Sequence, residues 1–161
     1  MTGAKRAVET SLIIRDMEQR DIDRVVELEN IVFPDPWPRS AFVEQIGGDG
    51  WGAIVAETDG PVIGYGCYFT LDAEAHLTNI AVDPEHRRKS VAKQLLKTIL
   101  GRAAEARCEY LILEVRESNT VARTFYERHG FRVLYRRPNY YRRPAEDAIV
   151  MVYYLDPPAK E

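Results

Sequence analysis

The sequence predicts a single α/β domain with a mixed, mostly antiparallel central sheet of about seven strands, flanked by about four helices. Two observations lead to this prediction: a β-hairpin pattern in residues 51–71 and a strand–helix–strand pattern across residues 76–115. A helix that connects two strands of one sheet places those strands parallel to each other. The 161 residues suit one domain, which we expect over residues 11–155, between a disordered tail over 1–10 and a C-terminal tail over 156–161.

The first expected elements are a strand and two helices. Residues 11–17 predict a short strand, and a helix begins near Asp21, whose carboxylate can cap free N–H groups. Prolines in residues 33–38 end this helix and make a stiff turn that presents Trp37. A second, short helix then runs to Gly47. The apolar residues of the first helix recur at helical spacing: Ile22, Val25, Val26 and Val32.

From Trp51 onward the hydrophobic period changes to the two-residue period of strands. Residues 51–58 and 62–71 flank an Asp-Gly turn and predict a β-hairpin, and residues 75–82 predict a third strand. A long helix follows over residues 88–106. Its apolar face consists of Val91, Leu95, Leu96, Ile99 and Ala103.

The C-terminal third predicts three more strands and a helix. Residues 110–115 are almost wholly apolar, which is typical of a strand buried on both faces. A helix with a Ser-Asn cap covers residues 120–129. Residues 131–135 and 149–155 predict the last two strands, joined by a connection over 136–147.

Composition and charge exclude several classes of protein. A formal net charge of −3 argues against a general nucleic-acid binder, which needs a basic face. No run approaches the roughly 20 apolar residues of a membrane span, and residues 1–10 lack the apolar core of a signal peptide. We therefore expect a cytoplasmic protein with no membrane contact and no direct nucleic-acid partner. Cys67 and Cys108 should be packing residues, and no metal is expected, because neither cysteines nor histidines have metal-ligand spacing.

A basic loop joins the strand over 75–82 to the long helix. It carries Arg87, Arg88 and Lys89 directly before the helix start, where unpaired N–H groups and the helix dipole attract anions. The arrangement suits a phosphate group, and a solvated surface turn is the alternative that the charges alone leave open.

Residues 80–92, which read Ile-Ala-Val-Asp-Pro-Glu-His-Arg-Arg-Lys-Ser-Val-Ala, resemble the acetyl-coenzyme A pyrophosphate loop of the GNAT superfamily of N-acetyltransferases. Residues 113–116 and several positions in 118–131 resemble the second half of the same family's core, so the match covers about residues 11–155. This resemblance implies the GNAT fold, acetyl-coenzyme A as co-substrate and direct transfer of the acetyl group to an amine.

Other positions are similar to the RimI group within that superfamily. They are residues 33–37, Phe42, 78–84, 113–116, 139–141 and 146–148. Members of this group acetylate the N-terminal α-amine of a small-subunit ribosomal protein, chiefly at alanine. The partner implied by the resemblance is therefore the N-terminal peptide of a protein, a ribosomal one beginning with alanine.

The resemblance also implies which residues bind the coenzyme. Backbone groups of Ile80 and Val82 should meet the pantetheine arm as a neighbouring strand would, and Asn119 should contact the coenzyme as well as cap its helix. The pyrophosphate should lie against the loop and helix start: Arg87, Arg88, Lys89, Ser90, Val91 and Ala92.

Ser90 departs from the family pattern, which has a glycine at this position. With a negative φ, Ser90 would keep its N–H free for the phosphate. With a positive φ, strain of about 1 kcal/mol or more would weaken cofactor affinity. We expect binding to be retained.

Two residues are candidates for the chemistry. Glu114, at the end of a buried strand, is the expected base, directly or through a water, although it could instead be an ion-pair partner for Arg116 or another basic group. Tyr126 is the expected acid, because a phenol is protonated at neutral pH and can donate to a departing thiolate. Its alternative role is packing of its helix onto the sheet.

For the acceptor, Trp37, Tyr140 and Tyr141 are the expected walls of a peptide groove, and Glu146 and Asp147 could attract a basic peptide. Trp37 could equally be a core residue. Two other functions remain open: acetylation of a small amine or a lysine, and a non-catalytic acyl-coenzyme A-binding module, which the departure at Ser90 motivates.

Overall fold

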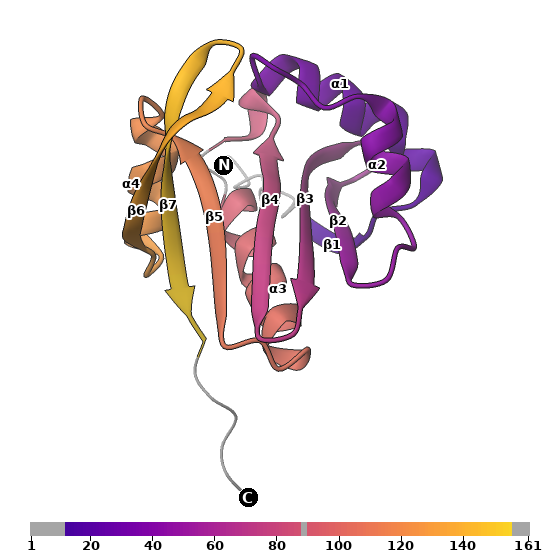
Figure 1. Ribbon diagram of the computed structural model, residues 1–161. Helices are drawn as coiled ribbons and strands as arrows, with labels where there is room; N and C mark the ends of the chain where they lie inside the picture. Colours follow the sequence, from indigo (N-terminus) through magenta and orange to yellow (C-terminus); the bar gives the residue numbers. More distant parts are fainter. Residues whose placement is uncertain (1–11, 88–89, 156–161) are drawn as a thin grey trace, which may run out of the picture.

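The computed structural model describes residues 12–87 and 90–155, so both expected tails, together with Arg88 and Lys89, lie outside the described residues. The described chain forms seven strands and four α-helices (Figure 1). In chain order they are β1 (Leu12–Asp16), α1 (Ile22–Val32), α2 (Arg39–Gln45), β2 (Trp51–Thr58), β3 (Val62–Leu71), β4 (Glu74–Val82), α3 (Val91–Glu105), β5 (Tyr110–Arg116), α4 (Thr120–Arg128), β6 (Arg132–Arg142) and β7 (Ala145–Tyr154).

The seven strands form one sheet in the order β1-β2-β3-β4-β5-β7-β6. Neighbouring strands are antiparallel except β4 and β5, which are parallel and are connected through α3. The predicted mixed and mostly antiparallel sheet, with a parallel pair made by the crossover, is therefore confirmed.

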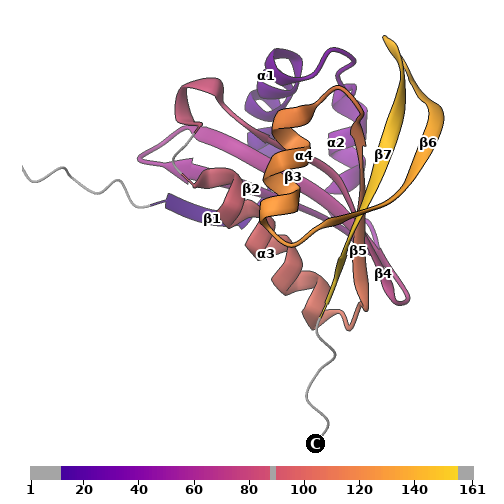
Figure 2. The same ribbon diagram turned by 90° about the vertical axis from the view of Figure 1, so that its left-hand side faces the viewer.

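Helices cover the two faces of the sheet unequally (Figures 1 and 2). The face under α3 and α4 carries the larger core, which includes Leu95, Ile99 and Tyr126 from the helices. The other face is covered by α1 and α2 over the first part of the sheet, where Leu28 and Phe42 are fully buried. This second face is left open toward β5 and β6.

The long helix α3 can lie close to the sheet because β3 contains glycine beneath it. A Cβ on Gly66 would lie 2.8 Å from Cδ1 of Ile99, which is closer than side chains approach one another. The predicted apolar face of α3 is buried throughout, and Cys67 and Cys108 are buried free thiols, as expected of packing residues.

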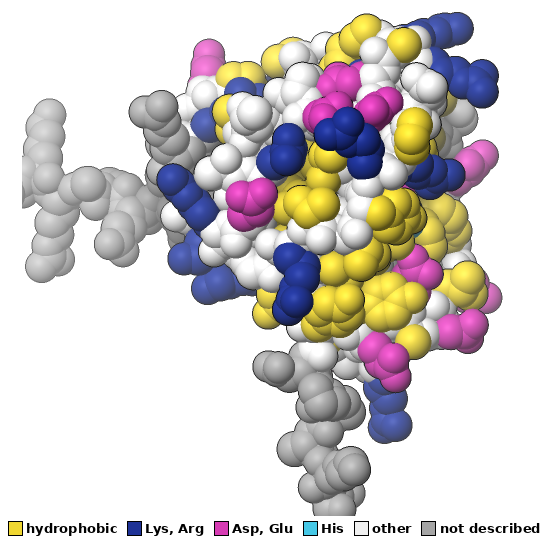
Figure 3. Space-filling model, turned by 60° about the vertical axis from the view of Figure 1, so that its left-hand side comes forward, with side chains coloured by type: hydrophobic (Ala, Val, Ile, Leu, Met, Phe, Trp, Pro, Cys, Tyr) yellow, Lys and Arg dark blue, Asp and Glu magenta, His cyan; other side chains and the backbone are white. Residues whose placement is uncertain are grey.

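The predicted connection over residues 136–147 is wrong, because β6 and β7 form one long hairpin. Register shifts at Val133/Tyr135 and at Arg137/Tyr141 interrupt the two-residue period by which a strand is recognised. Nearly all of β6 is also exposed, so its arginines and tyrosines follow no buried-face alternation. Figure 3 shows this side of the molecule, where hydrophobic and basic side chains are interspersed on the surface.

Strand β5 was expected to be buried on both faces, and this expectation is also wrong. Its side chains alternate between buried and half-buried: Leu111, Leu113 and Val115 lie in the core under α3 and α4. Ile112 and Glu114 face the side that α1 and α2 leave open. The open half of this face holds the candidate site.

Candidate functional site

Strands β4 and β5 separate partway along their length. Their pairing runs from Glu74 and Tyr110 to His76 and Ile112, and no pair is formed beyond that point in the described part of these two strands. The rest of β4 therefore has a backbone edge that β5 does not occupy, and this edge begins beside Glu114.

The free edge of β4 offers the backbone groups of Ile80 and Val82. The N–H of Asp83 donates to the carbonyl of Ile63 at 2.7 Å, so Asp83 belongs to a hydrogen-bonded pair of the antiparallel β3–β4 ladder. Because such pairs alternate with non-bonded ones, Val82 and Ile80 direct their N–H and C=O groups away from β3, toward the gap. This orientation suits a ligand that binds as an added strand.

Ser90 immediately precedes α3 and has a left-handed backbone conformation, with φ 62° and ψ 16°. Of the two conformations considered for this position, the structure has the one that favours glycine. The Ser90 hydroxyl makes no cap hydrogen bond, and the side chain is exposed. The first-turn N–H groups of Val91 and Ala92 are directed out of the helix start, an arrangement that favours anions in proteins generally.

A set of contacts to α1 fixes the start of this loop. Arg24 donates to the Asp83 carboxylate at 2.7 Å and to the Val62 carbonyl at 3.1 Å, and Asp83 also accepts from the N–H of Glu85 at 3.0 Å. The Glu85 N–H and the Arg24 charge hold the pKa of Asp83 below its usual range. Arg87 is exposed at the end of this turn.

Glu114 is paired with a residue that we did not expect at the site. Nε2 of His76 lies 2.6 Å from Oε2 of Glu114, and both side chains are largely buried. The His76 ring also stacks at 4.9 Å on Phe69, which in turn stacks at 4.9 Å on Trp51. The carboxylate therefore lies at one end of a row of rings on the open face of the sheet.

Of the ion pairs considered for Glu114, the one with Arg116 is not formed, whereas contacts with other basic groups, His76 and Arg137, are present. Arg116 donates to the carbonyls of Arg143 and Pro144 and to Glu146, and its guanidinium lies 4.2 Å from the Tyr141 ring centroid. The guanidinium nearest to Glu114 is that of Arg137, with Nη1 4.0 Å from Oε1.

Tyr126 has the packing role considered for its ring, and its role as the acid stays a prediction. Its ring packs edge-on against Phe125 and Phe131, at 5.2 and 5.4 Å, within the larger core. Burial, with the neighbouring Tyr141, raises the pKa of Tyr126, so the phenol stays protonated.

Tyr141 links the two halves of the site. Burial raises the pKa of Tyr141, and the nearby Tyr140 and Glu114 carboxylate raise it further. Tyr141 in turn raises the pKa of Tyr126. Tyr140 and Tyr141 stack edge to face at 5.0 Å, and Arg137 lies over the Tyr140 ring at 4.6 Å. The hairpin thus brings two of the predicted groove residues to Glu114.

Asn119 is the N-cap of α4, as predicted, with Oδ1 accepting from the N–H of Ala122 at 3.2 Å. Glu146 and Asp147, by contrast, are occupied within the hairpin region. Glu146 accepts from the N–H of Ser118 at 2.6 Å, and Asp147 accepts from the N–H of Asn139 at 2.9 Å.

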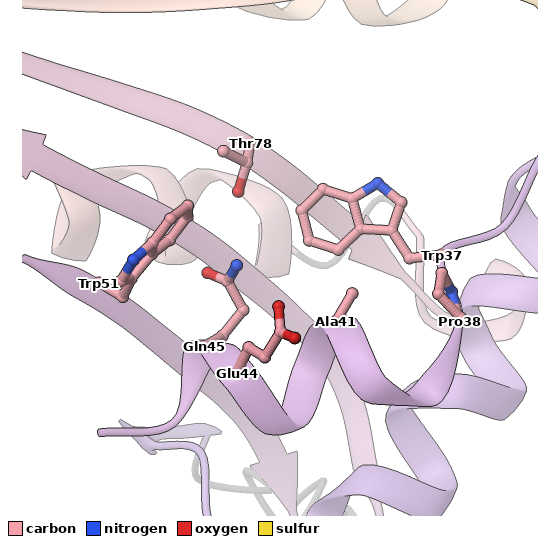
Figure 4. Close-up of a pocket in the computed structure, with 7 residues that line it drawn as sticks. All are labelled: Trp37, Pro38, Ala41, Glu44, Gln45, Trp51 and Thr78. Atoms are coloured by element: carbon pink, nitrogen blue, oxygen red, sulfur yellow. The ribbon is translucent and has the colours of Figure 1, made fainter. Parts of the chain in front are cut away.

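Trp37 is partly a core residue and partly exposed to a cleft, and its role as a wall of the peptide groove stays a prediction. Its ring packs on Phe42 at 5.6 Å and also lines a cleft of about 250 Å³ beside α2 (Figure 4). Behind it, the carboxylate of Glu29 accepts from the Trp37 N–H at 3.5 Å and from the Tyr65 hydroxyl at 2.5 Å. Glu29 is 1% exposed and also accepts from Asn79, with 2.9 Å to each oxygen.

Sequence reasoning missed His76 and Glu29 because their partners are distant in the chain. His76 meets Glu114 only through the register of the parallel pair, and Glu29 meets Asn79 only through packing of α1 on β4. The sequence contains one signal for Glu29, which lies at helical spacing with the apolar residues of α1 and should therefore face the core.

The described residues contain neither a candidate metal site nor a helix that could span a membrane. Within residues 12–87 and 90–155, no group of three or more histidine, cysteine, aspartate or glutamate side chains has an arrangement that could hold a metal ion. In the same ranges, no helix has the length and hydropathy needed to cross a bilayer.

Comparison with known proteins places the chain in a family. Residues 22–131 match the model of the acetyltransferase (GNAT) family. The chain is 32% identical over 146 residues to the ribosomal protein bS18-alanine N-acetyltransferase of Haemophilus ducreyi, covering 89% of this chain and 100% of that protein.

Solved structures agree with this match. The crystal structure of the ribosomal-protein-S18-alanine N-acetyltransferase from Escherichia coli superposes with a TM-score of 0.84 at 27% identity, covering 94% of this chain and 98% of that one. Arabidopsis thaliana NAA60 in complex with acetyl-coenzyme A has the same fold, with a TM-score of 0.81 at 18% identity over 90% of this chain and 99% of that one. The chain belongs to the GNAT family and is an acetyl-coenzyme A-dependent N-acetyltransferase.

Proposed function

We propose that the protein transfers the acetyl group of acetyl-coenzyme A to the N-terminal α-amine of a protein, in the manner of the RimI group. The observation that carries the proposal is the position of Glu114, which His76 holds at the point where β4 and β5 separate. The same face of the sheet is lined by Trp37 and Tyr140. The similarity to bS18-alanine N-acetyltransferases supports a ribosomal protein beginning with alanine as the acceptor. Such an acceptor also supports a cytoplasmic site of action.

The coenzyme supplies the acetyl group as a thioester, and the residues of this chain would bind it along the gap. Backbone groups of Ile80 and Val82 hydrogen-bond the pantetheine arm as an added strand. N–H groups from Ser90 to Ala92 and the positive end of α3 bind the pyrophosphate, assisted by the charge of Arg87. Arg88 and Lys89 follow Arg87 in the sequence and add positive charge for the pyrophosphate. The oxygen of Asn119 caps α4, and its amide N–H₂ group donates to the coenzyme.

The reaction needs one base and one acid. An α-amine has a pKa near ~7.7–8.0, so part of the acceptor is already neutral at pH 7. The amine nitrogen bonds to the thioester carbonyl carbon, and its proton passes to Glu114 directly or through a water. As the carbon–sulfur bond breaks, the Tyr126 hydroxyl gives its proton to the departing sulfur. No bond to the enzyme forms, so neither buried cysteine takes part.

One experiment distinguishes this function from the two alternatives, acetylation of a small amine or a lysine and acyl-coenzyme A binding without catalysis. Turnover is measured as thiol release with peptides beginning with alanine, serine and methionine, with the alanine peptide acetylated at its N-terminus, and with small amines. Preference for the free alanine peptide supports the proposal. Turnover of small amines alone, or acetyl-coenzyme A binding without any turnover, would replace it by the corresponding alternative.

A further inference from the structure

The cleft beside α2 lies between two tryptophans (Figure 4). One of them, Trp51, begins the row of rings that leads through Phe69 and His76 to Glu114. Trp37 and Trp51 stand on its two sides, Thr78 of β4 lies across from α2, and the side chains of Glu44 and Gln45 point from α2 toward the space between the rings. Its volume of about 250 Å³ is enough for a large amino-acid side chain.

Gln45 leaves this cleft with an unsatisfied acceptor. Its side chain is 6% exposed, and its Oε1 atom is buried without a hydrogen-bond partner among the described residues. A buried polar atom in this state has lost its hydrogen bond to water without a replacement, which is unfavourable. A ligand with a hydrogen-bond donor at this point would supply the missing bond.

Glu44 adds a negative charge at the mouth of the same cleft. Its carboxylate is exposed and makes no hydrogen bond or ion pair with the described residues, in contrast to the occupied carboxylates of Glu146 and Asp147. An acidic group, an unpaired carbonyl oxygen and two indole faces together favour a ligand that is cationic and has an apolar stem.

The cleft is within reach of the acceptor's first residues. Ring separations of 4.9 Å link Trp51 to Phe69 and Phe69 to His76, whose Nε2 lies 2.6 Å from Glu114. An extended peptide rises about 3.3 Å per residue. One or two residues of chain and a long side chain therefore span the distance from an amine at Glu114 to the cleft.

We propose that this cleft binds a basic side chain, arginine or lysine, at the second or third position of the acceptor peptide. The aliphatic stem lies between Trp37 and Trp51, and the charged head donates to Oε1 of Gln45 and to the Glu44 carboxylate. This specificity rests on the proposed N-terminal acetylation, which it refines. A neutral apolar side chain would fill the same space but leave Gln45 unpaired.

The test uses alanine-start peptides that differ only at the second or the third residue, which is arginine, lysine, methionine or glutamate. For the wild-type protein, kcat/KM should be about tenfold higher with arginine or lysine than with methionine at one of these positions, mainly through KM. Glu44→Gln and Gln45→Leu should each lower the ratio of arginine-peptide to methionine-peptide kcat/KM about fivefold. Gln45→Glu, which has the same size, should raise that ratio and remains informative if Gln45→Leu does not fold.

Glu105→Gln is the matched control, because Glu105 is an exposed carboxylate on α3, across the sheet from the cleft, and should leave the ratio unchanged. Equal turnover of all alanine-start peptides, or equal losses for arginine and methionine peptides in Glu44→Gln, would overturn this inference and leave the proposed function standing. Failure to acetylate any peptide would overturn both.

Discussion

His76 and Glu114 meet across the parallel β4–β5 pair, with Nε2 of the ring 2.6 Å from Oε2 of the carboxylate. The contact lies where the two strands separate, so it positions the Glu114 carboxylate, the proposed base, beside the free edge of β4. When Nε2 of His76 donates to Oε2 of Glu114, the other carboxylate oxygen, Oε1, is directed toward Arg137 and the open face of the sheet. We therefore assign His76 the role of a residue that orients Glu114.

Replacing His76 by phenylalanine should separate its hydrogen bond from its packing. Phenylalanine keeps the stacking on Phe69 but cannot donate to Glu114, so kcat should fall about tenfold, the equivalent of one lost hydrogen bond to a charged group. His76→Gln, which offers an amide N–H, should recover part of this loss. Steady-state kinetics with an alanine-start peptide measures both variants. Equal kcat for His76→Phe and the wild type would exclude the orienting role.

Tyr126→Phe should slow the reaction while leaving the coenzyme bound. The ring keeps its contacts with Phe125 and Phe131, and only the proton donor is lost, so kcat should fall by about 10²-fold or more. Calorimetric titration with acetyl-coenzyme A should give an unchanged Kd. Tyr154→Phe, at an exposed tyrosine, is the control and should behave as the wild type. An unaltered kcat in Tyr126→Phe would remove this residue from the mechanism.

Ser90→Gly should stabilise the protein. Ser90 has φ 62°, where a Cβ costs about 1 kcal/mol, so the glycine variant should exceed Ser90→Ala in free energy of unfolding by roughly that amount. From the sequence, a positive φ at Ser90 was expected to weaken cofactor affinity. The strain is already present in the free protein, however, so the affinity for the coenzyme should change little in Ser90→Gly. Urea denaturation measures the first effect and titration the second.

The same replacement at Ser40, in the first turn of α2, provides the contrast. Glycine should destabilise a right-handed helical position, so Ser40→Gly should lower the free energy of unfolding. If Ser90→Gly proved no more stable than Ser90→Ala, Ser90 would not be strained.

Glu29 should make stability depend on pH in a way that Glu29→Gln abolishes. Burial raises the pKa of Glu29 above its unfolded value, despite the hydrogen bonds from Tyr65 and Asn79. A raised native pKa contributes stability that is present below about pH 4.3 and is lost as pH rises through the native pKa. The free energy of unfolding of the wild type, relative to Glu29→Gln, should therefore decrease as pH rises above that value.

Urea denaturation at a series of pH values from mildly acidic to neutral measures this difference. Glu27→Gln, at an exposed glutamate of the same helix, is the control and should run parallel to the wild type. A constant difference between wild type and Glu29→Gln across the series would show that Glu29 has the same pKa in both states.

Local patterns predicted most of the fold, because α1 to α3 and β2 to β4 each keep one period and end at recognisable turns. Both strands of the β6–β7 hairpin were predicted in part, but their extension through residues 136–147 was missed because bulges and exposed arginines remove the period. The open face of β5 escaped because Ile112 is as apolar as its buried neighbours, and only the extent of α1 and α2 leaves it uncovered.

For the candidate site, the sequence gives only the residues that a family motif names, and their roles stay predictions. Glu114, Tyr126 and Asn119 stand at ends of elements, where the motif assigns them, and the structure adds the contacts that the motif does not contain. His76, Glu29 and Gln45 could not be found because each depends on strand register or helix packing across 38 or more residues, or on a hydrogen bond that is missing. The conformation of Ser90 likewise required coordinates.

The most direct test of the account is to locate the acetyl group on a product. The protein is incubated with acetyl-coenzyme A and an alanine-start peptide that also contains an internal lysine, and the product is fragmented by tandem mass spectrometry. The account predicts one acetyl group on the N-terminal α-amine and a large loss of product with Glu114→Gln. Acetylation of the lysine side chain instead, or an undiminished yield with Glu114→Gln, would contradict it.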